Sequence, residues 1–285
     1  LATATICSRD KLNITLGTNG VSVAALNYDI TLVSKDASLT GVPTTGTTLT
    51  ASAIRNDSYI NLTSLPLTVV YQVIPRSAAG CVGSPMTITV TVNPEPVMSP
   101  ALDNTICSGE ISNIILSTDG TSVSAASYKL VSLSVPGTIT ANGSNAAIGT
   151  TGSINLIKND KYTNNTSNAV VVVYGIQGIS NANCAGQVKL INLTINPTPA
   201  LDPSLNPTPV CSGVASNVTL AVAAGSVAAA TYNINSITFV GLTAGPGNSG
   251  IGTGKSANAI FNDVYINTTN GPLTAVYSIT PVTAS

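Results

Sequence analysis

The chain has 285 residues, of which only 7% are charged, and its net charge of −1 comes from 10 basic and 11 acidic residues. With no run of either sign, this composition excludes electrostatic capture of nucleic acid or of an anionic membrane surface. Apolar residues reach 44%; they are mostly aliphatic and set among Thr, Ser and Asn, which favours half-buried β-strands and argues against a disordered chain.

A segment near the start of the chain returns twice. Residues 6–8 and 13–16 (Ile-Cys-Ser with Asn-Ile-Thr-Leu) recur in similar form at 106–109 with 113–116, and at 210–213 with 217–220. All nine tyrosines follow the same period of about 100 residues. They form three sets: Tyr28, Tyr128 and Tyr232; Tyr59, Tyr162 and Tyr265; Tyr71, Tyr174 and Tyr277. A period of this length predicts complete domains, at residues 1–97, 98–201 and 202–285.

Within each repeat, short β-branched stretches alternate with turn residues, as at 128–133, 170–174 and 188–195. A period near two, bounded by Gly, Asn and Pro, predicts strands, and no segment has a sustained helical stripe. We therefore predict an all-β protein of tandem immunoglobulin-like antiparallel β-sandwiches. Proline-rich joints at 93–96 and 196–199 predict a stiff, elongated array. The longest apolar stretches are too short or too interrupted to enter a membrane.

The five cysteines receive a pairing from the repeat. Cys7 precedes a predicted first strand at 13–16, and Cys81 precedes a predicted last strand at 86–92. If these strands are parallel neighbours, their beginnings are adjacent, which predicts a disulfide between Cys7 and Cys81 and, in the second repeat, between Cys107 and Cys184. The third repeat would lack its last strand, and Cys211 would be unpaired by truncation, with its partner expected near position 287. Disulfides predict an oxidising, extracellular location.

Catalytic chemistry has little to draw on in this sequence. The absence of histidine excludes Ser-His-Asp and Cys-His arrangements, and no paired carboxylates recur as acid and base. No close Cys and His spacing predicts a zinc site. We therefore expect a protein that is not an enzyme and that has no cofactor and no metal.

The strongest local motif is Asn-Asp-x-Tyr in the middle of each repeat. Its residues are Asn56, Asp57 and Tyr59; Asn159, Asp160 and Tyr162; and Asn262, Asp263 and Tyr265. Asn and Asp bond their own backbone in turns, and a tyrosine two residues on can return its hydroxyl to the main chain, so we predict a structural turn. A calcium site at a domain junction is the alternative, although calcium usually draws on several carboxylates.

Sugar binding usually needs an exposed aromatic platform. The chain has no tryptophan, and Phe239 and Phe261, which occur only in the third repeat, are the candidates for such a platform. Sequons such as Asn61-Leu62-Thr63 are numerous, as expected by chance in a chain rich in Asn and Thr.

Together, Cys-Ser-Gly, Asn-Asp-x-Tyr, a strand ending in Tyr-x-Ile, the segment 80–90 and a closing Asn-Pro-x-Pro resemble the PKD-like repeat of very large surface proteins of Bacteroidota, such as flavobacterial gliding-motility adhesins. Arg9, in place of glycine, and Asn183, before Cys184, depart from the pattern. The resemblance implies a cell-surface filament exported by the type IX route and used in attachment or gliding, and it assigns no catalytic or ligand residues.

Three functions follow for testing. The first is a structural repeat of such a filament or adhesin, with neighbouring repeats of the same chain as partners. The second is a carbohydrate- or ligand-binding module of a secreted protein. The third is a self-assembling filament subunit, in which the open edge of the third repeat accepts a strand from another copy.

Overall fold

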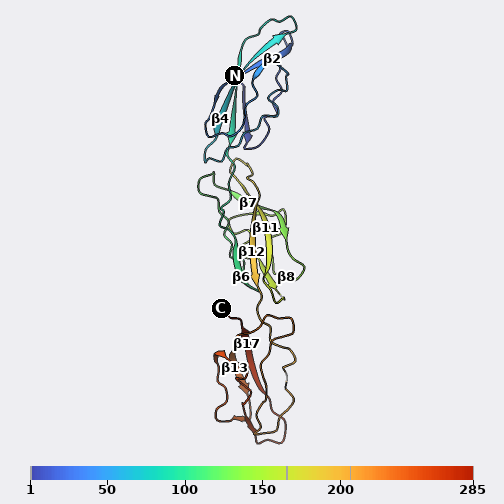
Figure 1. Cartoon of the computed structure of the whole chain (residues 1–285), viewed down its shortest axis with the longest axis vertical. Coiled ribbons are helices and arrows are strands. Elements are labelled where there is room, and N and C mark those ends of the chain that lie inside the picture. Colours follow the sequence, from blue (N-terminus) through green and yellow to red (C-terminus); the bar gives the residue numbers. More distant parts are fainter. Residues whose placement is uncertain (1, 165, 206, 285) are drawn as a thin grey trace.

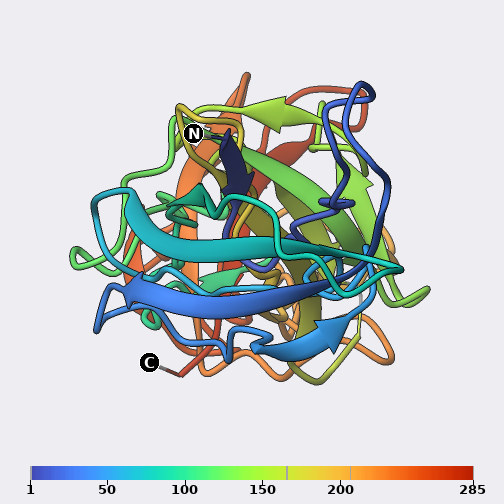
Figure 2. The same cartoon turned by 90° about the horizontal axis from the view of Figure 1, so that it is seen from above.

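The computed structural model describes residues 2–164, 166–205 and 207–284, and every regular element among them is a β-strand. Figure 1 shows three lobes placed end to end, and Figure 2, which looks down the long axis, shows them overlapping within about one lobe's width. Buried apolar side chains form three separate clusters. The all-β prediction is confirmed. The boundaries at 1–97, 98–201 and 202–285 stay predictions, although Leu201 packs against the third cluster, and Ser285 lies outside the described residues.

The first lobe is built on one five-stranded sheet in the order β1-β5-β4-β2-β3. The strands are β1 (Ala2–Cys7), β2 (Ala25–Lys35), β3 (Gly46–Leu49), β4 (Leu67–Ser77) and β5 (Met86–Asn93). β1 and β5 run parallel, with Ala2 opposite Ile88 and Cys7 opposite Asn93, and the other neighbours are antiparallel. Alternation along β5 buries Ile88, Val90 and Val92 on the inner face.

Less regular chain forms the opposite layer of the first lobe. The backbone N–H of Leu12 donates to Asp57 O at 2.9 Å, and that of Leu16 donates to Ala51 O at 2.8 Å. Leu12 and Leu16 pack with Ile54 and Tyr59 against the sheet. The prediction of a first strand at 13–16 is therefore wrong: the first strand is β1, and 13–16 lies in the layer that faces it.

The second lobe repeats this sheet in the order β6-β12-β11-β7-β9, beside a two-stranded sheet of β8 and β10. The strands are β6 (Asn104–Cys107), β7 (Ser127–Ser134), β8 (Ile139–Asn142), β9 (Thr151–Gly152), β10 (Lys161–Asn164), β11 (Val170–Ile179) and β12 (Lys189–Asn196). β6 and β12 are parallel, with Cys107 opposite Asn196, as Cys7 is opposite Asn93 in the first lobe.

The third lobe has a sheet in the order β15-β13-β17 and a pair of β14 with β16. The strands are β13 (Thr231–Phe239), β14 (Leu242–Ala244), β15 (Gly252–Lys255), β16 (Tyr265–Asn267) and β17 (Ala275–Val282). Within the described ranges, β17 pairs only with β13. Val276 lies on β17, which has a described partner strand on one side, and it is 55% exposed. The equivalent Val70 and Val173 lie on strands that have a partner on both sides.

Candidate functional site

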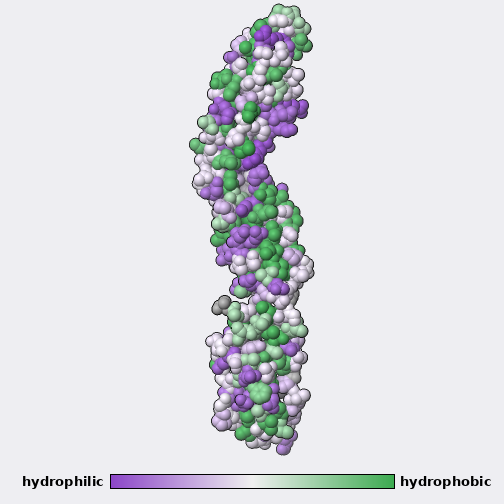
Figure 3. Space-filling model, in the orientation of Figure 1, coloured by the Kyte–Doolittle hydropathy of each residue, from purple (hydrophilic) through white to green (hydrophobic). Residues whose placement is uncertain are grey.

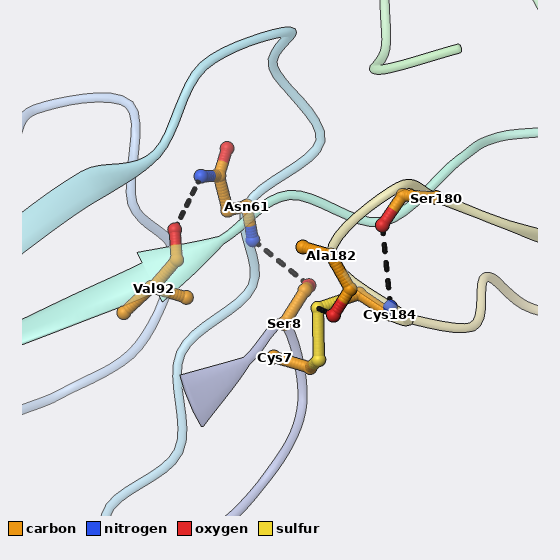
Figure 4. The surroundings of a disulfide bond; sticks show 7 residues. All are labelled: Cys7, Ser8, Asn61, Val92, Ser180, Ala182 and Cys184. Carbon is orange, nitrogen blue, oxygen red and sulfur yellow. Dashed lines mark hydrogen bonds between the residues drawn. A yellow bond between two sulfur atoms is a disulfide. The ribbon is translucent and has the colours of Figure 1, made fainter. Parts of the chain in front are cut away.

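The disulfide of this chain joins two lobes instead of closing one. Cys7 is bonded to Cys184, 177 residues later, with a Cα–Cα distance of 5.3 Å (Figure 4). Cys81, Cys107 and Cys211 are free and exposed. The predicted pairs Cys7–Cys81 and Cys107–Cys184 are therefore wrong.

The error follows from the position of the first strand. Cys7 ends β1, opposite Asn93 at the end of β5, whereas Cys81 precedes the beginning of β5. The eight residues of β5 therefore separate Cys7 from Cys81 by about 25 Å along the strand, at about 3.3 Å per residue. A disulfide requires Cα atoms within about 7 Å, so Cys7 cannot reach Cys81.

Each cysteine of the bridge is held by its neighbours. On the first lobe, Ser8 N–H donates to Asn93 O at 2.9 Å, and Ser8 Oγ accepts from Asn61 N–H at 3.0 Å (Figure 4). On the second lobe, Cys184 lies in the hairpin between β11 and β12, where its N–H donates to Ser180 Oγ at 3.2 Å and its carbonyl accepts from Ser180 N–H at 2.9 Å. The bridge therefore joins the ordered end of β1 to the ordered hairpin between β11 and β12.

The linker beside the bridge is buried. Pro94, Glu95 and Pro96 are all inaccessible, and Glu95 is only 1% exposed. Arg9 Nε donates to both carboxylate oxygens of Glu95, at 2.8 and 3.0 Å. Arg9 has a φ of 70°, in the left-handed region where Gly109 stands in the second repeat. Arg9 therefore forms this ion pair from a backbone conformation that favours glycine.

Further contacts fix the angle between the first two lobes. A Cβ built on Gly186 would lie 1.9 Å from Pro96 O, so the linker packs directly on the hairpin that contains Cys184. Val123 N–H of the second lobe donates to Thr63 O of the first at 3.1 Å. Val97 N–H donates to Ser122 Oγ at 2.9 Å. Covalent, ionic and hydrogen-bonded contacts therefore meet at this junction.

Asp119 supports the same junction from the second lobe. Hydrogen bonds from Ser122 N–H, and from the hydroxyls of Ser122 and Thr121, lower the pKa of Asp119 to about 2. The joint between the second and third lobes keeps the equivalent of the serine contact, with Ala200 N–H donating to Ser226 Oγ at 2.9 Å. It differs at Thr198, the counterpart of Glu95, which is exposed.

The aspartate of the Asn-Asp-x-Tyr motif is buried in each lobe. Asp57 N–H closes a turn onto Ile54 O at 3.1 Å, but its carboxylate accepts from Tyr71 Oη at 2.6 Å and from Thr44 N–H at 2.8 Å. Tyr59 Oη bonds Tyr71 Oη, so the predicted return of its hydroxyl to the main chain is wrong. The three asparagines Asn56, Asn159 and Asn262 are exposed, and the three aspartates are buried.

The same tyrosine pair recurs in the other lobes. Tyr174 Oη donates to Tyr162 Oη at 3.2 Å, and the hydroxyls of Tyr265 and Tyr277 are 2.7 Å apart. Tyr277 also donates to Asp263 at 2.5 Å. These side chains join the two layers of each sandwich across 12 to 14 residues of sequence.

Burial controls the protonation of these clusters. It raises the pKa of Tyr59 to about 12 and raises that of Tyr71 further, so both hydroxyls stay protonated and can donate. Burial also raises the pKa of Asp160, whose Oδ2 is buried without a hydrogen-bond partner. The carboxylates face tyrosines and backbone, and within the described ranges no group of three or more acidic, Cys or His side chains could hold a metal ion.

The aromatic candidates for sugar binding do not form an open platform. Phe239 is 37% exposed and packs edge-on against Tyr265, with ring centroids 5.2 Å apart. Phe261 is half-buried, and its carbonyl accepts from Asn217 N–H at 2.9 Å. Figure 3 shows polar and apolar side chains interspersed along the visible face of all three lobes.

A second recurring motif, Tyr-x-Asn-x-Thr, was missed by the sequence reasoning. Asn61 is fully buried, and its amide donates to Val92 O at 2.8 Å and Leu65 O at 2.9 Å, while its Oδ1 accepts from Thr63. Asn164 makes the same two amide bonds, to Ile195 O and Asn168 O, and Asn267 makes the second of them, to Gly271 O. The signal was available, because the sequon at 61–63 recurs at the same place in each repeat. It is a structural lock, and Asn61 and Asn164, which are buried, are closed to glycosylation.

Comparison with known proteins finds one family similar to the first repeat. Residues 4–96 match the family described as PKD-like domain, which confirms the resemblance to a PKD-like domain for that part of the chain. No curated protein gives a significant match. No helix among the described residues is long and apolar enough to cross a membrane.

Several solved structures of extracellular proteins are similar at low identity. Mouse clustered protocadherin PcdhgC3 EC1-3 is 10% identical, with both chains fully covered and a TM-score of 0.27. BT4661, a SusE-like surface polysaccharide-binding protein of Bacteroides thetaiotaomicron, is 9% identical over 99% of this chain and 57% of its own, with a TM-score of 0.30. The sialic acid binding region of a Streptococcus sanguinis adhesin is 10% identical over 94% of each chain, with a TM-score of 0.20. Scores this low carry no functional argument.

Proposed function

We propose that this chain is an extracellular spacer segment, in which PKD-like repeats hold a surface adhesin or filament extended. The observation that carries the proposal is the position of the disulfide. Cys7–Cys184 bridges the end of one lobe to the beginning of the next, at a junction whose linker is already buried. A bond placed there opposes bending and separation of the lobes.

The bond also changes how tension travels along the chain. A force applied at the ends of the chain passes through β1 to Cys7, across the sulfurs to Cys184, and on through β12. Residues 8–183 are then shielded from extension, although they contain most of both lobes. Resistance to stretching suits a protein that holds a cell to a surface.

Small-angle scattering of the oxidised chain tests the extended shape. The longest strands have 11 residues, or about 36 Å, so three lobes in line reach about 110 Å and a radius of gyration of about 32 Å. A compact protein of 285 residues would give about 19 Å. A value near the compact figure would refute the spacer proposal and return attention to ligand binding between packed lobes.

Attachment and gliding at the surface of a bacterium, with export by the type IX route, are the finer part of the proposal and rest on the resemblance of the repeats. Antibodies against the fragment should label intact cells of the source organism. Deletion of the gene should reduce surface attachment or gliding speed. Labelling that requires permeabilised cells would contradict this part.

A further inference from the structure

The three free cysteines occupy the same two kinds of position as the two bonded ones. Cys107 matches Cys7: each ends the strand parallel to the last strand of its lobe. The serine that follows each donates its N–H to the end of that last strand, Ser8 to Asn93 O at 2.9 Å and Ser108 to Asn196 O at 2.8 Å. We call this position the strand-end cysteine.

Cys211 takes the place of the strand-end cysteine in the third lobe, although the described residues 207–230 form no strand. Gly213 N–H donates to Tyr265 O at 3.0 Å, as Gly109 N–H donates to Tyr162 O at 2.9 Å in the second lobe. Ser212 Oγ accepts from Asn267 N–H at 2.9 Å. The turn around Cys211 is therefore built in the same way as the turns that follow β1 and β6.

Cys81 matches Cys184 in the hairpin before the last strand, and we call this position the hairpin cysteine. Ser77 N–H donates to Cys81 O at 3.0 Å and Cys81 N–H donates to Ser77 Oγ at 3.2 Å, as Ser180 does with Cys184 at 2.9 and 3.2 Å. Free cysteines therefore occupy both kinds of position, and the chain around them has the same local structure as the chain around the bonded cysteines.

The two kinds of position lie at opposite ends of a lobe, because β1 ends where β5 ends and the hairpin precedes β5. Cys81 therefore stands at the end of the array before the first lobe, and Cys211 at the end after the third. Both cysteines are free and exposed. Cys107, in contrast, faces the junction that the third lobe already occupies.

We propose that Cys81 and Cys211 are complementary halves of an end-to-end docking surface for another PKD-like repeat, sealed by a strand-end to hairpin disulfide like Cys7–Cys184. This inference rests on the proposed function as a spacer. A second copy of this chain, docked head to tail, presents the required partner. By the same rule, a cysteine in the hairpin after β17 would pair with Cys107 and not with Cys211.

The bond forms by thiol–disulfide exchange. The thiolate of Cys211 attacks a small-molecule disulfide and expels one thiolate, and the thiolate of Cys81 then attacks the mixed disulfide and expels the second. Two protein thiols lose two protons and two electrons, and the oxidant leaves as two thiols. Docking of the lobe ends raises the effective concentration of the second thiol, which is the source of selectivity.

The test uses chains of all 285 residues that keep Cys7–Cys184 and one free thiol each. The first variant, Cys107→Ser with Cys211→Ser, keeps Cys81. The second, Cys81→Ser with Cys107→Ser, keeps Cys211. Equal amounts, one of them isotope-labelled, are equilibrated in a glutathione redox buffer, and mass spectrometry counts the dimers and verifies that Cys7–Cys184 stays intact.

Random pairing would give twice as many mixed dimers as either like dimer. Because only unlike ends dock, the observed ratio of mixed to like dimers should be higher than this by about tenfold or more. A ratio of 1:2:1, or no dimer at all, would overturn the proposal. The matched control keeps Cys107, through Cys81→Ser with Cys211→Ser, because its local structure is the same but its junction is filled. Equal reaction of Cys107 and Cys211 with Cys81 would show that thiol exposure alone governs pairing, which also overturns the proposal.

Failure of this inference is separable from failure of the spacer proposal. A chain with Cys81, Cys107 and Cys211 all changed to Ser should keep a radius of gyration near about 32 Å in scattering. That result upholds the spacer whatever the dimer ratio shows.

Discussion

Reduction of one disulfide should change the maximum extension of this chain by more than half. In the oxidised chain, the bond between Cys7 and Cys184 closes 177 residues of sequence. Each extended residue spans about 3.5 Å, so these residues hold back about 620 Å of contour length when the bond is intact. The Cα atoms of the bridge are only 5.3 Å apart, so almost all of that length appears when the bond is absent.

Single-molecule stretching between handles at the two ends measures the effect directly. The whole chain of 285 residues should extend to about 1,000 Å after reduction, and to about 380 Å while oxidised. The variant Cys7→Ser should behave as the reduced chain under both conditions. The matched control Cys81→Ser removes an exposed free thiol and should behave as the unchanged chain.

The loop also has a thermodynamic consequence. On the chain-entropy account, a disulfide that closes 177 residues lowers the entropy of the unfolded state. It thereby raises the free energy of unfolding by about 5 kcal/mol when both lobes unfold. Reduction should therefore lower the urea midpoint of the first two lobes and leave the third lobe unchanged. Equal contour lengths with and without reductant would refute the reasoning, since they would mean that Cys7 and Cys184 are not bonded in the folded chain.

Three further predictions concern the core and the junction. Because burial raises the pKa of Asp160 in the folded state, the second lobe should lose stability as pH rises from below about 3.9 through that raised pKa, and Asp160→Asn should abolish this slope in urea titrations; an unchanged slope would contradict the assignment. Asn61→Ala removes the amide donor from the carbonyl of buried Val92 and one of the two donors to Leu65 O, and should cost about 2 kcal/mol in urea unfolding, whereas exposed Asn56→Ala should cost less than about 0.5. Arg9→Gly leaves buried Glu95 without its ion-pair partner and should destabilise the first lobe by about 2 kcal/mol, more than Glu95→Thr, which leaves a solvated arginine; the reverse order would argue against the ion pair.

The sequence alone determined the fold class and the repeat. Period-two alternation of β-branched residues between turn residues is a local property, so strands such as β11 and β12 could be predicted from their own side chains. The recurrence of every tyrosine at one period predicted that these residues belong to the cores, and all of the first two repeats' tyrosines are buried. Neither inference needs knowledge of which strands are neighbours.

Contacts distant in sequence were decided by the tertiary structure. The turn motif was found in the sequence, yet the partner of Asp57 is Tyr71, and the partner of Tyr59 is again Tyr71, because the two layers of the sandwich face each other there. The lock around Asn61 was passed over as a chance sequon because its partners, Val92 and Leu65, are identified only by the fold.

The disulfide shows the limit most clearly. The sequence showed that both cysteine positions recur. The predicted first strand follows Cys7, whereas the observed first strand, β1, ends at Cys7, and these two arrangements place the sulfur at opposite ends of the lobe. Pairing β1 with β5 in parallel, with Cys7 opposite Asn93, selects the far end. Only the stacking of the second lobe on that end then brings Cys184 within bonding distance, because no local pattern in the sequence encodes how two separate cores meet.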